Sequence, residues 1–221
     1  MNKSKAHIRY KDSKGNILPG VTTILGILAK PALIHWSWKL GMEGIDYHKF
    51  RDEKADAGTL GHLFIMNHLR KKKTDTSEYS KKIINMAENS FLSFLEWEKE
   101  HKLKPILIEE PLICEDWGFG GTPDYFGFVN ANILNDKPEL IDFKTGSGIY
   151  DEYIIQLAAY QQLVINSDKT NELPEKVRIL RIPRSNDEAF EERLLSGKEL
   201  KVAWNIFLNC LAIYKLKKEL K

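Results

Sequence analysis

Two aspartates and one lysine have the types and spacing to do chemistry together. Asp124 lies in the segment GTPDYFGFV, and Asp142 and Lys144 lie in ELIDFKT. Both segments are rich in β-branched and aromatic residues, which predicts strands. Because successive side chains of a strand point to opposite faces, Asp142 and Lys144 share one face. If the two strands pair as a hairpin, Asp124 comes within a few ångströms of Asp142.

A carboxylate pair beside an ammonium group predicts a site for a hard divalent cation. Mg²⁺ typically binds one or two carboxylates together with substrate phosphate oxygens. Lys144 would help to deprotonate a water at the cation, or offset charge that builds on a phosphorus atom. The alternative for an Asp-x-Lys tripeptide is an ordinary ion pair on a solvated face. The apolar residues around it favour burial instead, and buried charges require a reason.

Turn residues and apolar periodicity predict the elements that position this cluster. Helices are predicted over residues 22–30, 32–42, 55–69, 83–101, 149–165 and 197–221, with Thr22 or Thr23 capping the first. Strands are predicted in a hairpin over residues 7–18 and over residues 106–113, 122–129, 139–145, 176–183 and 187–195. The last helix is expected to carry Val202, Ile206, Leu211 and Tyr214 along its apolar stripe.

This order of elements predicts an α/β fold with a central mixed sheet of four to five strands flanked by helices, preceded by a helical N-terminal region. The 221 residues are expected to form a single domain. Residues 1–104 would be its hairpin and helical part, and residues 105–221 its sheet and flanking helices.

Four short motifs stand in an order that resembles the PD-(D/E)XK nuclease superfamily, in its RecB-like branch. They are GTLGH with His62, GTPD with Asp124, IDFKT with Asp142 and Lys144, and QLAAY from Gln156 to Tyr160. The segment ILPGVTTIL is also similar to the PSVTTIL segment of phage-type and mitochondrial genome maintenance exonucleases, with Gly20 in place of serine. The resemblance runs from about Pro19 to Tyr160 and implies a restriction-endonuclease-like core.

The resemblance also implies residue roles. His62, Asp124, Asp142 and the backbone carbonyl of Phe143 would ligate the metal, and Lys144 would be catalytic together with the two aspartates. The cofactor would be Mg²⁺, with Mn²⁺ as a workable substitute because one ligand is an imidazole.

Four further residues are predicted to bind substrate or to support the site. Gln156 and Tyr160 lie four residues apart on one helix, so their side chains share a face. Glu109 and Glu110 are neighbours on a strand, so only one of them can face the site, and Glu110 is preferred. Thr122 of the GTPD motif completes the set. The five tryptophans are expected to pack rather than to stack on bases, with Trp117 the best exception.

The predicted function is a metal-dependent DNA nuclease that hydrolyses phosphodiester bonds in recombination, repair or phage DNA processing. Exonuclease activity follows from the resemblance alone. A structure-specific endonuclease with the same site remains an alternative, as does a catalytically silent DNA-binding module. The expected partners are DNA, as single strands or duplex ends, and a recombination or single-strand-binding protein.

Composition limits the remaining classes. The 33 Lys and Arg against 31 Asp and Glu give a formal charge of +2, so any nucleic-acid surface must be local. Cys114 and Cys210 cannot supply the four thiolates of an iron–sulfur cluster, and none is expected. The uncharged stretch of residues 15–29 is too short to span a membrane, so no membrane partner is expected. With Met1 taken as a true start, the predicted location is the cytoplasm of a bacterial or phage-infected cell.

Overall fold

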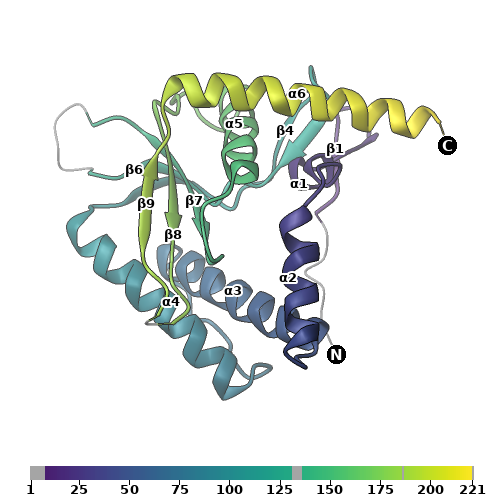
Figure 1. Ribbon diagram of the computed structural model, residues 1–221. Helices are drawn as coiled ribbons and strands as arrows, with labels where there is room; N and C mark the ends of the chain where they lie inside the picture. The colour runs from purple at the N-terminus through teal and green to yellow at the C-terminus, as the bar shows by residue number, and fades with distance from the viewer. Residues whose placement is uncertain (1–7, 131–135, 186, 221) are drawn as a thin grey trace.

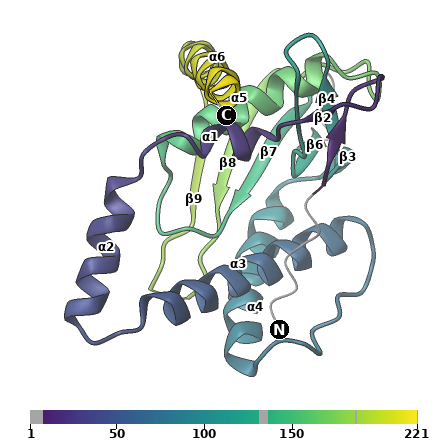
Figure 2. The same ribbon diagram turned by 90° about the vertical axis from the view of Figure 1, so that its right-hand side faces the viewer.

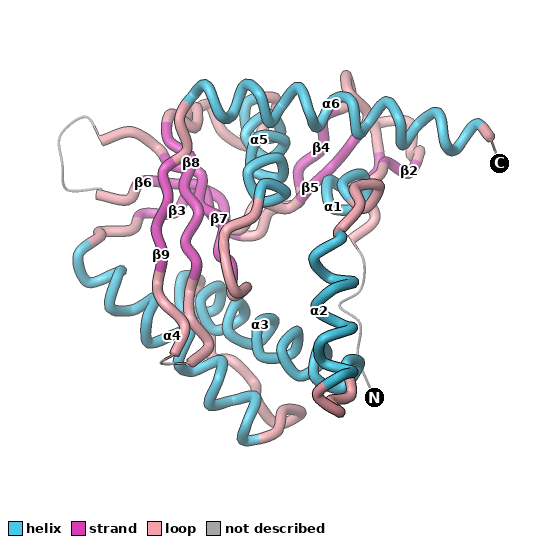
Figure 3. Tube along the Cα trace, in the orientation of Figure 1, coloured by secondary structure: helices cyan, strands magenta, loops and turns pink. Residues whose placement is uncertain are grey.

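The centre of the fold is a five-stranded mixed sheet in the order β3-β6-β7-β8-β9 (Figures 1 and 3). A computed structural model describes residues 8–130, 136–185 and 187–220. The strands are β3 (Lys104–Ile108), β6 (Tyr125–Phe128), β7 (Glu139–Lys144), β8 (Lys176–Arg181) and β9 (Glu191–Leu194). Only β7 and β8 run parallel, while the other neighbours are antiparallel. The predicted α/β class and the mixed sheet of four to five strands are confirmed.

Helices cover both faces of this sheet (Figure 2). On one face, α1 (Val21–Leu25), α5 (Asp151–Ile165) and α6 (Gly197–Glu219) share a core with Leu140 of β7. On the other, α3 (Tyr47–Leu69) and α4 (Lys81–Glu100) pack on Ile141 and Phe143 of the same strand. Because successive side chains of β7 point to opposite faces, the strand contributes to both cores. This explains why its sequence is almost continuously apolar.

Two small hairpins lie beside the main sheet. One is formed by β1 (Tyr10–Lys11) and β2 (Ile17–Leu18), and the other by β4 (Leu112–Cys114) and β5 (Phe119–Gly121). The ring of Tyr10 lies so close to Gly120 that a Cβ there would be 2.3 Å from it. The pairing of β1 with β2 confirms the predicted N-terminal hairpin, whose first predicted residue, His7, lies outside the described residues.

Several helix and strand boundaries predicted from the sequence differ from those in the structure. Residues 106–113 do not form one strand, because Glu109 has a φ of 45° and Pro111 follows, so the chain breaks into β3 and β4. Strand β5 lies between two predicted strands, in a segment where no strand was predicted. Helix α1 ends at Leu25 rather than Lys30, and Gly20 precedes it without a side-chain cap, so the threonine cap is wrong. Helix α3 begins at Tyr47 rather than Ala55, where Asp46 accepts a hydrogen bond from the Lys49 amide.

The remaining helices follow the prediction closely. Helix α2 spans Pro31–Met42, with proline in its first turn, where no amide partner is lost. Helix α6 begins with a capping box between Ser196 and Glu199, and Lys221 of the prediction lies outside the described residues. The predicted stripe of α6 is wrong in part, since Val202 and Ile206 are exposed. Of the helices in the described ranges, none combines the length and apolar character that crossing a membrane requires.

Candidate functional site

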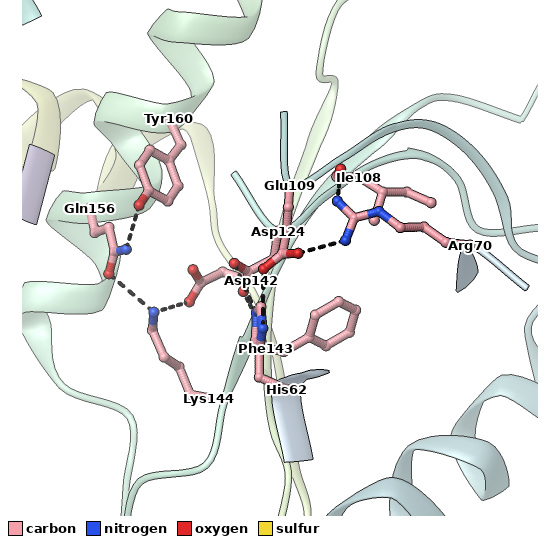
Figure 4. A network of polar contacts seen from close by, with 10 residues as sticks. All are labelled: His62, Arg70, Ile108, Glu109, Asp124, Asp142, Phe143, Lys144, Gln156 and Tyr160. Carbon is pink, nitrogen blue, oxygen red and sulfur yellow. Dashed lines mark hydrogen bonds and ion pairs between the residues drawn. The ribbon is translucent and has the colours of Figure 1, made fainter. Parts of the chain in front are cut away.

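The register of β6 and β7 brings Asp124 and Asp142 together (Figure 4). Tyr125 is opposite Ile141, so Asp124, one residue before β6, lies beside the end of β7 that carries Asp142. Asp124 Oδ2 accepts a hydrogen bond from the Phe143 amide at 2.9 Å. The backbone of one predicted ligand thus fixes the carboxylate of another.

His62 reaches this pair from α3. Its Nε2 lies 3.1 Å from Asp124 Oδ1, and its Nδ1 lies 3.5 Å from Glu109 Oε1. Helix α3 can come this close because Gly58, one turn earlier, has no side chain. A Cβ at Gly58 would be 2.5 Å from Thr145 Oγ1, just beyond β7. The GTLGH motif therefore has a steric reason for its first glycine.

Lys144 connects the carboxylates to α5. Its Nζ lies 2.6 Å from Asp142 Oδ2 and donates a hydrogen bond to Gln156 Oε1 at 3.1 Å. Gln156 Nε2 in turn donates to the Tyr160 hydroxyl at 2.9 Å. The same ammonium group lies 4.8 Å from the centre of the Tyr153 ring, a distance suited to a cation–π contact. These contacts hold the lysine in one orientation.

Burial and charge shift the ionisation of the three groups differently. Burial raises the pKa of Asp142 to about 6, and nearby Asp124 adds to the rise although Lys144 opposes it. Burial would also raise the pKa of Asp124, but the contacts with His62 and Lys144 outweigh it and lower this pKa. Burial alone would lower the pKa of Lys144, yet the two carboxylates raise it. Lys144 is therefore an ammonium group at neutral pH.

The donor set fits a hard divalent cation. Asp142 is only 1% exposed, and its Oδ1 accepts no hydrogen bond from any described residue. A buried carboxylate oxygen without a donor is costly, and a cation would satisfy it. No trio of His, Cys, Asp or Glu in the described ranges is already spaced to enclose an ion. His62 and Lys144 instead contact the carboxylates directly, so both contacts would have to loosen for an ion to bind.

The cluster lies at the wall of a cleft with a volume of about 490 Å³. His62 of α3, Asp124 just before β6, and Phe143 and Lys144 of β7 line the cleft. Positive and aromatic side chains line the remainder, namely Trp36, Arg51, Lys54, Tyr153 and Arg184. The cleft thus places cations around a carboxylate centre, which suits a polyanionic substrate that also needs a metal.

Three predicted residues lie away from this cluster. The preference for Glu110 is wrong, because its side chain is 43% exposed and pairs with Lys169 at 3.3 Å. Glu109 faces the site instead. Thr122 Oγ1 hydrogen-bonds with the Tyr10 hydroxyl at 2.9 Å and does not line the cleft. Trp117 packs edge-on against Trp204 of α6.

Sequence reasoning missed the residues that complete the cleft. Arg70 donates hydrogen bonds to Glu109 Oε2 at 2.7 Å and to the Ile108 carbonyl at 2.6 Å, which orients the carboxylate toward His62. It begins the RKKK run, whose three lysines are exposed. Arg51, Lys54 and Arg184 carried no motif. Arg51 and Lys54 lie one helical turn apart on α3, but the predicted helix began at residue 55, so this spacing gave no signal.

Comparisons with known proteins add little. No protein-family model matches the chain, and no curated protein matches it. A solved structure of a candidate exonuclease from Eubacterium rectale is similar over 69% of this chain, with 11% identity and a TM-score of 0.45. The chain spans 64% of that protein's length. A second solved protein, known by a locus number alone, is similar over 68% of this chain and 84% of its own, with 16% identity and a TM-score of 0.26. What the chain does is therefore argued from its own residues.

Proposed function

We propose that the protein is a metal-dependent DNA nuclease that hydrolyses phosphodiester bonds. The observation that carries the proposal is that Asp124, His62 and Lys144 line one cleft together with positive side chains, while Asp142 is buried in contact with Lys144. Two acids with an imidazole fit a divalent cation, and a held ammonium group fits a phosphate. The order of the four sequence motifs is independent support.

The ion would be Mg²⁺, with Mn²⁺ as a substitute, held by His62, Asp124, Asp142 and the carbonyl of Phe143. When bound, it would polarise the scissile phosphate and lower the pKa of a nearby water. Loosening of the Lys144 contact on Asp142 would free a carboxylate oxygen for the ion. The Asp142 Oδ1 atom accepts no hydrogen bond from any described residue and would be a second oxygen for the ion once these contacts loosen.

Lys144 would act as a fixed positive charge toward the phosphate. Because the neighbouring carboxylates raise its pKa, it does not lose its proton readily and is a poor general base. Its ammonium group would instead offset negative charge that builds on the phosphate oxygens. Gln156 would keep Nζ aimed at the cleft, and Tyr160 would hold Gln156 in turn.

DNA is the proposed substrate because cationic side chains line the same cleft as Asp124 and Lys144. Arg51 and Lys54 from α3 and Arg184 from the segment after β8 would contact phosphates on either side of the scissile bond. Action on chain ends, and a place in recombination, repair or phage DNA processing, rest on the resemblance of the motifs.

The test is digestion of labelled DNA with Mg²⁺, Mn²⁺ or a chelator. We expect metal-dependent release of nucleotides from linear DNA, and its loss in Asp142→Asn. Glu110→Gln is the matched control, because this exposed acid pairs with Lys169 and points away from the site. Full cleavage by Asp142→Asn would refute the proposal. Cleavage of covalently closed circular DNA would show that the protein is an endonuclease rather than an exonuclease. Binding of DNA in a gel-shift assay without any cleavage would indicate a catalytically silent DNA-binding module.

A further inference from the structure

Helix α6 has two apolar faces, and only one of them packs on the protein. The inner face is formed by the buried residues Leu200, Ala203, Phe207, Cys210 and Leu211. We call the other face the outer stripe, and it consists of Val202, Ile206, Asn209, Ile213, Leu216 and Leu220. Its apolar members are between 40% and 87% exposed. Large apolar side chains gathered on one face of a helix indicate an interaction surface.

The outer stripe points away from the rest of the chain. At 100° per residue its mean direction is about 140° around the helix axis from that of the inner face. Figure 1 shows α6 running along the upper edge of the molecule, with the sheet and the other helices below it. Figure 2 shows the same helix end-on, again at the outer edge. A second helix can therefore lie along the stripe without meeting the protein beneath.

The spacing of the stripe is that of a two-helix seam. Its members follow one another at intervals of four, three, four, three and four residues, the alternation of the a and d positions in a coiled coil. A helix that only covers a globular core needs a wider stripe and no such strict alternation. The regular alternation therefore favours another straight helix as the occupant.

The C-terminal end of α6 also supports a second helix as the occupant of the stripe. The C-terminal part of the helix extends past the other elements in Figure 1. Ile213, Leu216 and Leu220 are 49%, 60% and 87% exposed there. Helices in proteins owe most of their stability to packing of an apolar face, and the described part of the chain leaves these three side chains largely uncovered.

We infer that α6 forms the interface of a homodimer in which the two helices run antiparallel. The stripe is symmetric about residue 211, so a two-fold axis there gives every member a partner from the complementary position. Val202 would face the partner's Leu220, Ile206 the partner's Leu216, and Asn209 the partner's Ile213. The stripe is therefore self-complementary, which favours a second copy of the chain as its partner.

Charge favours the antiparallel arrangement over the parallel one. Lys215, Lys217 and Lys218 lie in the last two turns of α6. Parallel packing would place these lysines beside their copies, whereas antiparallel packing separates the two groups by about 17 Å of helix. Opposed helix dipoles also attract.

The dimer leaves the catalytic cleft of each copy open. Figure 1 places α6 on the side of the sheet opposite α3, which lines the cleft. The inference therefore goes beyond the proposed nuclease activity and does not depend on it.

Sedimentation velocity of the full chain over a wide concentration range tests the interface. We expect a reversible monomer–dimer equilibrium, and in Ile213→Glu a dimer dissociation constant raised by roughly 100-fold or more. Leu173→Glu is the matched control, since Leu173 is 57% exposed but lies before β8. Circular dichroism confirms that each variant is folded. A monomer at every concentration, or a dimer that Ile213→Glu leaves intact, overturns the inference.

Disulfide trapping tests the orientation. Val202→Cys alone is expected to give no cross-linked dimer, and the double variant Val202→Cys/Leu220→Cys is expected to give one. Native Cys114 and Cys210 are buried and do not interfere. Cross-linking by Val202→Cys alone would indicate parallel helices and overturn the antiparallel dimer. A monomer that binds anionic lipid vesicles, and loses this binding in Ile213→Glu, would assign the stripe to a membrane surface instead.

Discussion

Lys144 Nζ lies 2.6 Å from Asp142 Oδ2, so the predicted catalytic ammonium group occupies the place beside a predicted metal ligand. Asp142 is 1% exposed and Lys144 is held further by Gln156. In the proposed nuclease, the lysine and the metal ion therefore compete for one carboxylate. This competition makes the two roles separable by mutation.

Lys144→Met is expected to lose cleavage and to gain metal affinity. Loss of the charge that faces the phosphate should slow hydrolysis roughly 100-fold or more. Loss of the competing ammonium group should tighten Mn²⁺ binding, measured by isothermal titration calorimetry. Lys169→Met is the control, since Lys169 pairs only with exposed Glu110 among the described residues. Weaker Mn²⁺ binding in Lys144→Met would contradict the competition.

Asp142 is expected to titrate near pH 6 in the metal-free protein, because burial raises its pKa to about 6 from 3.8. A folded pKa above the unfolded value means that this group stabilises the fold below about pH 4, and that the contribution disappears as the pH rises through 6. A bound cation favours the charged form, so Mg²⁺ should lower the pKa and bind more tightly as the pH rises from 5 to 7. Carboxyl ¹³C NMR, with Asp142→Asn to assign the resonance, measures it.

The matching control for this titration is Asp124, whose pKa is lowered. Its resonance should not move between pH 5 and 7. An Asp142 resonance that titrates near pH 4 in the metal-free protein would contradict the predicted effect of burial on its charge.

The centre of the site could be predicted because strand alternation and short motifs are local. The period of two in ELIDFKT places Asp142 and Lys144 on one face, and the hairpin register then places Asp124 beside them. The same rule failed at Glu109 and Glu110 because β3 ends at Ile108. Glu109 has a φ of 45°, and alternation does not apply in a turn. Its orientation depends on Arg70, which no local pattern links to it.

The other features that the sequence did not predict depend on how distant segments pack together. Arg51 and Arg184 are far apart in the sequence and meet at the cleft only because α3 packs beside the ends of β7 and β8. Helix α6 shows a second limit, because periodicity finds apolar stripes but does not say which stripe meets the core. The predicted stripe of this helix combined Val202 and Ile206 from the outer face with Leu211 from the inner one.

Gly58→Ala is expected to move His62 away from the carboxylates. The added Cβ would be 2.5 Å from Thr145 Oγ1, so α3 must shift or Thr145 must rotate. We expect a loss of about 1–3 kcal/mol in the free energy of unfolding and weaker metal binding. Chemical denaturation and calorimetry measure the two effects.

Two further variants show whether the contact itself is responsible. Gly41→Ala lies in helix α2 with nothing within 4 Å of the new Cβ, so it should be neutral or stabilising. Thr145→Ala should restore metal binding in the Gly58→Ala background, because it removes the atom that the Cβ would meet. No rescue by Thr145→Ala would mean that Gly58 serves another purpose.

Arg51→Gln and Lys54→Gln are expected to weaken DNA binding through phosphate contacts. Both side chains line the cleft. Each lost contact should reduce the slope of log affinity against log salt by about 1, or by about 0.7 for a single strand. Fluorescence anisotropy with a chelator present measures binding without cleavage. Lys71→Gln and Lys72→Gln are the controls, because these lysines are exposed beyond the end of α3 and do not line the cleft. Equal changes of slope in both pairs would mean that the cleft does not track the DNA backbone.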